Sequence, residues 1–231
     1  MPRASRRAEV RATAARLFRE YGYNAATMDL IADSVGLNKG TLYYYYPGKS
    51  AILYELLSDQ LDATLTLLAR VPDGGSAADR LRDFIRMQVK RVASKPDELV
   101  LFFRELPLID NNLPPEQVAS LRARIEQYRA YSVRLLTDGV AAGEFRPLDA
   151  SAVHYSIVGI LAYIPIWFPP SAGRSASDLV DELADFVLSG VAVRDEAGVS
   201  DDLGDNGTAT ADPARPGRKE RAHRSQGKGT R

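Results

Sequence analysis

Apolar residues recur with the period of an α-helix from residue 10 to about residue 193 of this 231-residue chain. Segments with the alternating pattern of a half-buried strand are not evident. The pattern therefore predicts an all-α fold with about nine helices. The first of them is expected to bury one apolar stripe, formed by Val10, Ala14, Leu17, Phe18 and Tyr21.

Glycine and proline divide the helical pattern into segments. Three short helices are expected within residues 5–47, and a longer one from Lys49 to the break at Pro72. Further helices are expected over 77–94, 97–109, 115–142, 150–168 and 176–193. From about Asp195 the chain loses apolar residues and gains Gly, Pro, Ser, Asp and Arg. We expect a first domain over residues 1–47, a larger one over 48–194 and a disordered basic tail over 195–231.

The charges of the chain are concentrated, although its formal net charge is zero. Residues 1–50 carry eight Lys/Arg against four Asp/Glu, and residues 213–231 carry seven against one. These basic ends are candidate contacts for a polyanion. Alternatively, the basic C-terminal tail is only a soluble, disordered end that does not contact DNA.

Cysteine is absent, which excludes disulfides, thiol catalysis and Cys-ligated zinc. The two histidines, His154 and His223, do not make a metal cluster, so neither metal nor cofactor is expected. No secretion signal is recognisable, and the apolar run over 153–168 falls short of a membrane span of roughly 20 residues. A cytoplasmic protein without a membrane contact is expected.

The pattern of residues 27–49 predicts a DNA-binding motif. A short helix with Thr27 as its expected N-cap is followed by a break at Gly36 and a second short helix with four successive tyrosines, residues 43–46. Two short helices joined by a glycine-containing turn form a helix-turn-helix DNA reader. Tyrosine suits that surface, because its hydroxyl reaches phosphate while its ring packs on sugars or thymine methyls.

The order of these motifs over residues 5–55 resembles the tetracycline-repressor (TetR) family of bacterial transcriptional regulators. The resemblance lies in residues 18–23 (Phe-Arg-Glu-Tyr-Gly-Tyr), 27–32 (Thr-Met-Asp-Leu-Ile-Ala), 35–43 (Val-Gly-Leu-Asn-Lys-Gly-Thr-Leu-Tyr) and 46–49 (Tyr-Pro-Gly-Lys). It implies that Tyr46 belongs to the core and that Tyr45 replaces a usual histidine. The DNA-contacting residues that it implies, together with a basic arm, are Arg6, Thr27, Lys39, Gly40, Thr41, Tyr43, Tyr44, Tyr45 and Lys49.

In this family the second domain binds a small molecule and forms the dimer. Residues 143–147 (Gly-Glu-Phe-Arg-Pro) and 167–170 (Trp-Phe-Pro-Pro) resemble members that control lipid or steroid breakdown and sense acyl-CoA thioesters. Such an effector needs an apolar tunnel and a cation for its phosphates. The expected ligand contacts are Phe102, Phe103, Arg104, Tyr128, Arg129, Tyr163 and Trp167.

The segments 150–168 and 176–193 are apolar enough to pack against a second subunit, and we expect a homodimer through them, with His154 on that face. The leading hypothesis is a ligand-responsive repressor that binds a palindromic operator as a dimer. The alternatives are a regulator of drug efflux that responds to aromatic or cationic compounds, an activator or ligand-free architectural protein, and an all-α enzyme with an apolar pocket. No Ser-His-Asp set or phosphate loop supports the enzyme.

Overall fold

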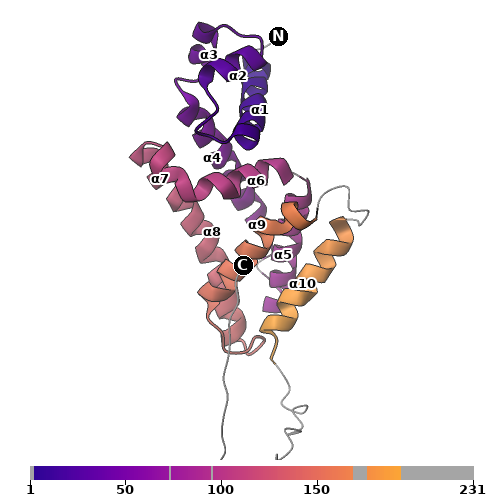
Figure 1. The fold of residues 1–231 in the computed structure, drawn as a ribbon. Coiled ribbons are helices and arrows are strands. Elements are labelled where there is room, and N and C mark those ends of the chain that lie inside the picture. The colour runs from indigo at the N-terminus through magenta and orange to yellow at the C-terminus, as the bar shows by residue number, and fades with distance from the viewer. Residues whose placement is uncertain (1–2, 73, 95, 169–175, 194–231) are drawn as a thin grey trace, which may run out of the picture. The chain divides into compact units, whose positions relative to one another are not determined.

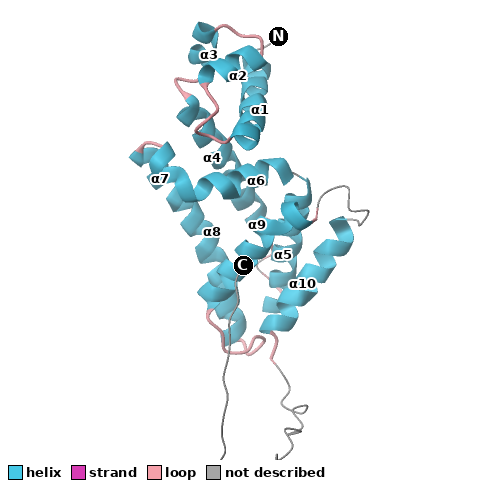
Figure 2. Cartoon of the chain, viewed as in Figure 1, coloured by secondary structure: helices cyan, strands magenta, loops and turns pink. Residues whose placement is uncertain are grey.

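The computed structural model describes residues 3–72, 74–94, 96–168 and 176–193. Over these ranges the regular elements are α-helices and one 3₁₀ turn, which confirms the predicted all-α fold (Figure 2). The predicted basic tail, residues 195–231, lies outside the described residues. Everything described belongs to one compact unit, Met1–Arg194.

The first three helices are α1 (Arg3–Tyr21), α2 (Met28–Ser34) and α3 (Lys39–Tyr45), which lie together at one end of the described part of the chain (Figure 1). Their buried apolar residues belong to the first of two apolar cores. α1 ends where Gly22 adopts a φ of 86°, a left-handed conformation that favours glycine. Phe18 is buried as predicted, whereas Tyr21 is half-exposed. Tyr21 lies on the last turn of α1 with its side chain largely in solvent, so it does not extend the buried stripe.

The fourth helix, α4 (Lys49–Leu68), belongs to both apolar cores of the molecule. Its first half places Ile52, Leu53 and Leu57 among the residues of α1–α3, and its last residue, Leu68, lies in the second core. A single rigid helix therefore joins the three-helix unit to the rest of the chain.

The next segment contains α5 (Ala77–Ser94), α6 (Pro96–Glu105), a 3₁₀ turn η1 (Leu106–Leu108) and α7 (Ile109–Asn112). One helix over 97–109 was predicted, and it is interrupted at Pro107. The proline ring disfavours the α conformation of Leu106 and removes one backbone donor. The described residues accordingly contain ten α-helices, where about nine were expected.

The last three helices are α8 (Pro115–Ala141), α9 (Ala150–Trp167) and α10 (Ala176–Val191), which form the second core with α5. α8 requires a glycine at 139, because a Cβ there would lie 2.1 Å from the Phe145 ring. α10 packs along α5, and Asp181 of α10 pairs with Arg86 of α5 at 2.8 Å.

α9 is apolar on nearly all sides, but only part of it is covered. It has the length and the apolar composition of a membrane-spanning helix, and only 22% of its residues are buried within this subunit. A helix that packs against a second protein chain has the same composition. The large apolar side chains that α9 and α10 expose are Tyr155, Tyr163, Ile166, Trp167 and Phe186.

The boundary predicted between residues 47 and 48 does not coincide with a gap in the packing. The first core combines α1–α4 with apolar residues of α6, α7 and α8, among them Leu101, Ile109 and Leu121. The three-helix unit therefore packs directly against α6, and it shares its core with residues of α7 and α8.

Candidate DNA-binding surface and internal cavity

The starts of α2 and α3 are fixed by side-chain caps. Thr27 Oγ1 accepts a hydrogen bond from the Leu30 N–H at 3.1 Å, and Asn38 Oδ1 accepts one from the Thr41 N–H at 2.8 Å. Gly36, with a φ of 65°, turns the chain between the two helices. Each cap satisfies a backbone donor that the helix itself leaves unpaired, so the angle between α2 and α3 is set locally.

The tyrosines of α3 divide between an inner and an outer side. Tyr46 is buried beneath the helix, as predicted, whereas Tyr43 and Tyr44 are 44% and 64% exposed. Tyr45 is partly buried against the core and lies edge-on to Tyr44, with the ring centroids 5.6 Å apart. Only two of the four rings are therefore fully presented outward.

The polar residues around α3 remain at the surface. Gly40 is exposed and Thr41 partly so. The Lys39 ammonium group lies 2.9 Å from Asp29 of α2, and both side chains are about 60% exposed. Exposed pairs of this kind contribute little to stability, so Lys39 can exchange its partner for another anion at small cost.

Lys49 has a different role from the predicted phosphate contact. Its ammonium group donates to the backbone carbonyls of Tyr23, Asn24 and Ala26 at 2.8–3.2 Å. These bonds use all three of its donors. Lys49 therefore secures the loop between α1 and α2, and a phosphate would have to displace one of these carbonyls.

The two arginines Arg6 and Arg7 lie within α1, where the sequence predicted a basic arm, and both have partners within the chain. Arg6 pairs with Glu9 at 2.7 Å on the exposed side of α1. Arg7 binds Glu55 of α4 and lies over the Tyr46 ring, 4.6 Å from its centroid. Tyr46 donates to the same carboxylate at 3.1 Å. Burial, reinforced by Glu55, raises the pKa of Tyr46 to about 12, so its hydroxyl remains a donor at neutral pH.

An internal cavity of about 200 Å³ lies among α4, α5, α6, α8 and α9. Three predicted ligand contacts line it: Phe102, Phe103 and Tyr128. The other lining residues are Leu61, Thr64, Gln88, Arg91, Val92, Leu99, Leu106, Ile125, His154, Tyr155, Val158 and Leu161. Arg91 is the one cation among these lining residues, and none of them is a carboxylate.

Besides Arg91, the cavity wall carries the uncharged polar groups of Gln88, Tyr128 and His154, and each of them has a hydrogen-bond partner. Tyr128 Oη accepts a hydrogen bond from Gln88 Nε2 at 2.6 Å, and burial raises the pKa of Tyr128 to about 12. His154 Nδ1 lies 2.5 Å from Ser132 Oγ. Burial, and then the charge of Arg129, lowers the pKa of His154. His154 is therefore an interior residue of the cavity wall, and its predicted place on the dimer face is wrong.

Four residues predicted as ligand contacts lie away from this cavity. Arg129 is paired with Glu126 at the surface, at 2.7 Å, and Tyr163 and Trp167 belong to the exposed side of α9. Arg104 donates to the carbonyls of Phe18 and Arg19 at the end of α1, the latter at 2.9 Å. Helical spacing identifies an aromatic face, but it does not say whether that face turns inward or outward.

The sequence interpretation missed Gln88, Arg91 and His154. Gln88 occupies a position on the apolar stripe of α5, between Ile85 and Val92, and is itself buried. A buried polar residue within an otherwise apolar stripe needs a hydrogen-bond partner inside the protein, and it therefore indicates a polar site in the interior. Arg91 has no comparable signal, because its place depends on the neighbouring helices.

Comparison with known families assigns the helix-turn-helix and the helices around the cavity to two different family models. Residues 10–56 match the family described as bacterial regulatory proteins, tetR family, and residues 74–191 match the tetracyclin repressor-like C-terminal domain. The chain belongs to the TetR family. This TetR-family protein is therefore a transcriptional regulator with a helix-turn-helix, and the enzyme alternative is set aside.

Its relatives include the HTH-type transcriptional repressor KstR2 of Mycolicibacterium smegmatis, which is 29% identical over 191 residues that cover 81% of this chain and 91% of KstR2. The structure of KstR2 of Mycobacterium tuberculosis, a ketosteroid transcriptional regulator, is 25% identical with a TM-score of 0.74 over 82% of this chain and 96% of that one. AibR, solved in complex with isovaleryl coenzyme A and operator DNA, is 24% identical with a TM-score of 0.69 over 78% and 97%. At 24% identity, the similarity to AibR shows that the two proteins share a fold.

Proposed function

We propose that this TetR-family regulator is a repressor that binds a palindromic operator as a homodimer and releases it when an acyl-CoA or related lipid metabolite binds. The observation that carries the proposal is the outer side of α3, which presents Tyr43 and Tyr44 on a helix whose start is fixed by Asn38. KstR2 is named a repressor, which supports the same role here. The cytoplasm, where the operator is found, is the expected site of action.

The proposed DNA contacts divide into two groups. Tyr43, Tyr44 and Thr41 would meet base edges and methyl groups in the major groove. Thr27, Lys39, Gly40, Tyr45 and Arg6 would lie along the adjacent backbone, where cations and polar groups bind phosphate without reading sequence. Because Lys49 is occupied by three carbonyls, we assign it to the support of this surface.

Two copies of this surface would be brought together by α9 and α10. The large apolar side chains of these helices, Tyr163, Trp167 and Phe186 among them, are about half or more exposed in this subunit. Burying them against the same face of a second copy gives an isologous four-helix seam. The two α3 helices would then enter half-sites whose centres lie about 34–36 Å, or a multiple of this, apart.

The cavity favours an anionic effector with an apolar part. Its aromatic wall suits an acyl group or a fused ring, and its one cation, Arg91, suits a negative charge. The isovaleryl-CoA complex of AibR and the ketosteroid description of KstR2 are in keeping with that chemistry. A cationic drug, the alternative for an efflux regulator, would find no carboxylate among the lining residues.

The route from cavity to operator runs through α6. Phe102 and Phe103 line the cavity, and the next residue, Arg104, holds the end of α1. An effector that displaces these rings would shift α6 and with it the three-helix unit. Because the coupling of two sites is reciprocal, operator DNA would weaken effector binding by the same factor.

Fluorescence anisotropy with DNA from beside the gene tests the proposal. Tyr43→Ala should weaken operator binding at least tenfold, an effect of about 1.4 kcal/mol. The matched control is Tyr21→Ala, which removes an exposed tyrosine from the C-terminal end of α1, outside α3. Equal operator affinity of the two variants would contradict the assignment of the reader. Release of DNA by isovaleryl-CoA, and not by a cationic drug, is the expected effector result.

A further inference from the structure

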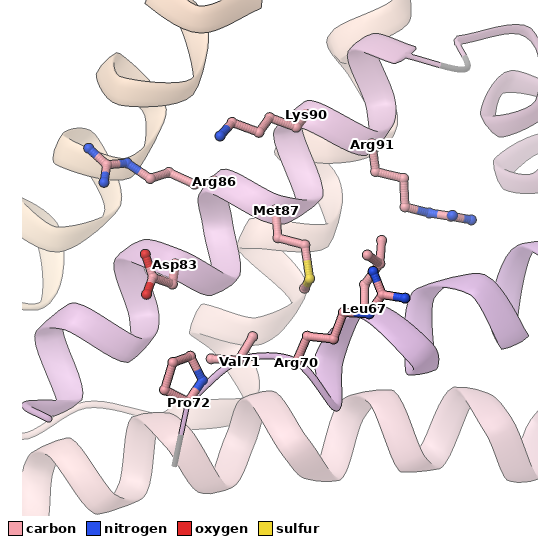
Figure 3. A pocket seen from close by; sticks show the side chains of 9 residues that line it. All are labelled: Leu67, Arg70, Val71, Pro72, Asp83, Arg86, Met87, Lys90 and Arg91. Atoms are coloured by element: carbon pink, nitrogen blue, oxygen red, sulfur yellow. The ribbon is translucent and has the colours of Figure 1, made fainter. Parts of the chain in front are cut away.

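A second hollow lies on the outside of the same helices that enclose the cavity. It measures about 690 Å³ and lies between α5 and the end of α4 (Figure 3). Its lining residues are Leu67, Arg70, Val71, Pro72, Asp83, Arg86, Met87, Lys90 and Arg91. Four of these nine residues are cations and one is an acid, although the chain as a whole has no net charge. We call this hollow the basic groove.

The basic groove has an apolar floor and a cationic rim. Met87 points from α5 toward Val71 and the end of α4, and Lys90 extends from the next turn of α5 (Figure 3). Arg70 and Lys90 are exposed, and neither side chain makes a hydrogen bond or an ion pair with another described residue. Arg86 is held at the rim by Asp181 of α10. Such a surface complements an anion that also carries apolar atoms.

Arg91 lines both the basic groove and the internal cavity, and it is the one residue that the two linings share. Its Nη2 donates to the backbone carbonyl of Gln60 at 2.7 Å and also to the Gln60 side-chain oxygen. Gln60 belongs to α4, the helix that continues into the three-helix unit. The guanidinium group is thus a link between α5 and α4 at the junction of the two hollows.

We propose that the basic groove receives the phosphate-bearing head of the effector, while its apolar part occupies the cavity and Arg91 meets the anionic junction between them. This inference rests on the proposed function and assigns the two parts of that effector, the apolar acyl or ring group and the phosphorylated nucleotide carrier, to two different hollows. An anion at the junction competes with Gln60 for Arg91. Effector binding would thereby loosen the link to α4 at the same time as the acyl group displaces Phe102 and Phe103 of α6.

Isothermal titration calorimetry on the full-length protein tests the groove with isovaleryl-CoA, coenzyme A alone and isovalerate. The variant is Arg70→Gln combined with Lys90→Gln, which removes two exposed charges of the rim. The control is Arg122→Gln combined with Arg134→Gln, which removes two exposed charges from α8. The rim variant should bind isovaleryl-CoA and coenzyme A at least tenfold more weakly than the control does. Isovalerate binding should be the same in both.

A second measurement follows the release of operator DNA. The rim variant should bind the operator as tightly as the wild type, but it should need at least tenfold more isovaleryl-CoA to release it. Unchanged affinity of the rim variant for isovaleryl-CoA would overturn the groove and leave the proposed effector class intact. Failure of the wild type to bind either isovaleryl-CoA or coenzyme A would overturn both, whereas operator binding by α3 would still stand as a separate result.

Discussion

Tyrosine side chains are exposed on two surfaces of this protein, and their surroundings assign them different partners. On α3, Tyr43 and Tyr44 lie beside Lys39, Gly40 and Thr41 on a short helix with capped ends. On α9, Tyr155 and Tyr163 lie beside Ile166 and Trp167, and Phe186 of α10 extends that apolar face.

An exposed aromatic ring is compatible with either a nucleic acid or a second subunit. The charge and polarity of its neighbours decide between them, because phosphate selects cations and donors while an apolar face selects another apolar face. We therefore expect salt to weaken the binding of DNA to α3 but not the dimer, and an added charge on the apolar face to break the dimer.

Salt should separate the two surfaces most strongly. A dimer that neutralises 6–10 phosphates loses about 10³–10⁵ in DNA affinity between about 50 and 200 mM salt. An apolar dimer seam keeps its affinity over that range, because it releases no counterions. Anisotropy for the operator and analytical ultracentrifugation for the dimer measure the two responses. Operator binding that is insensitive to salt would contradict the assignment of α3.

A negative charge on α10 should break the dimer. Phe186→Glu would bury an unpaired carboxylate in the seam, which costs several kcal/mol and weakens dimerisation at least 100-fold. Operator affinity should fall with it, because a single α3 reads only half of the site. Leu108→Glu, which places the same charge on an exposed apolar residue of η1, is the control. A Phe186→Glu protein that sediments as a dimer would remove α10 from the seam.

Loss of the α3 cap should have a moderate effect. Asn38→Ala leaves the Thr41 N–H without its acceptor and should cost about 1 kcal/mol of unfolding free energy. Operator affinity should fall about fivefold, because α3 is less well ordered before it binds. Urea unfolding and anisotropy measure the two quantities. Asn111→Ala on α7 is the matched control and should change neither.

The smallest expected effect is a pH dependence of the stability, which arises from His154 on the buried side of α9. The pKa of His154 is lowered in the native state, so below about pH 6.5 the unfolded chain binds the additional proton. Native stability therefore falls as pH decreases from 6.5 toward the native pKa of His154. Urea unfolding of the wild type should show this loss, and His154→Gln should reduce it. Parallel pH profiles of the two proteins would show that His154 titrates as it does in the unfolded chain.

Much of the fold could be predicted from residues close together in the sequence. Helical spacing gave the all-α class, and Thr27 was correctly placed as a cap because its acceptor and the donor of Leu30 are three residues apart. Tyr46 was correctly placed in the core, since it shares a helical face with Leu42. The cavity residues Phe102, Phe103 and Tyr128 followed from the same logic of aromatic residues on apolar faces.

The sequence alone thus determined the family, the all-α class and the place of the helix-turn-helix, because these depend on residues that are close together in the chain. The tertiary structure decided which charged groups meet. Lys49 bonds carbonyls about 25 residues away, and Arg104 holds carbonyls of α1 85 and 86 residues away. It also placed Arg91 between the cavity and the basic groove. Long side chains reach partners from several helices, so their roles depend on packing that no local pattern encodes.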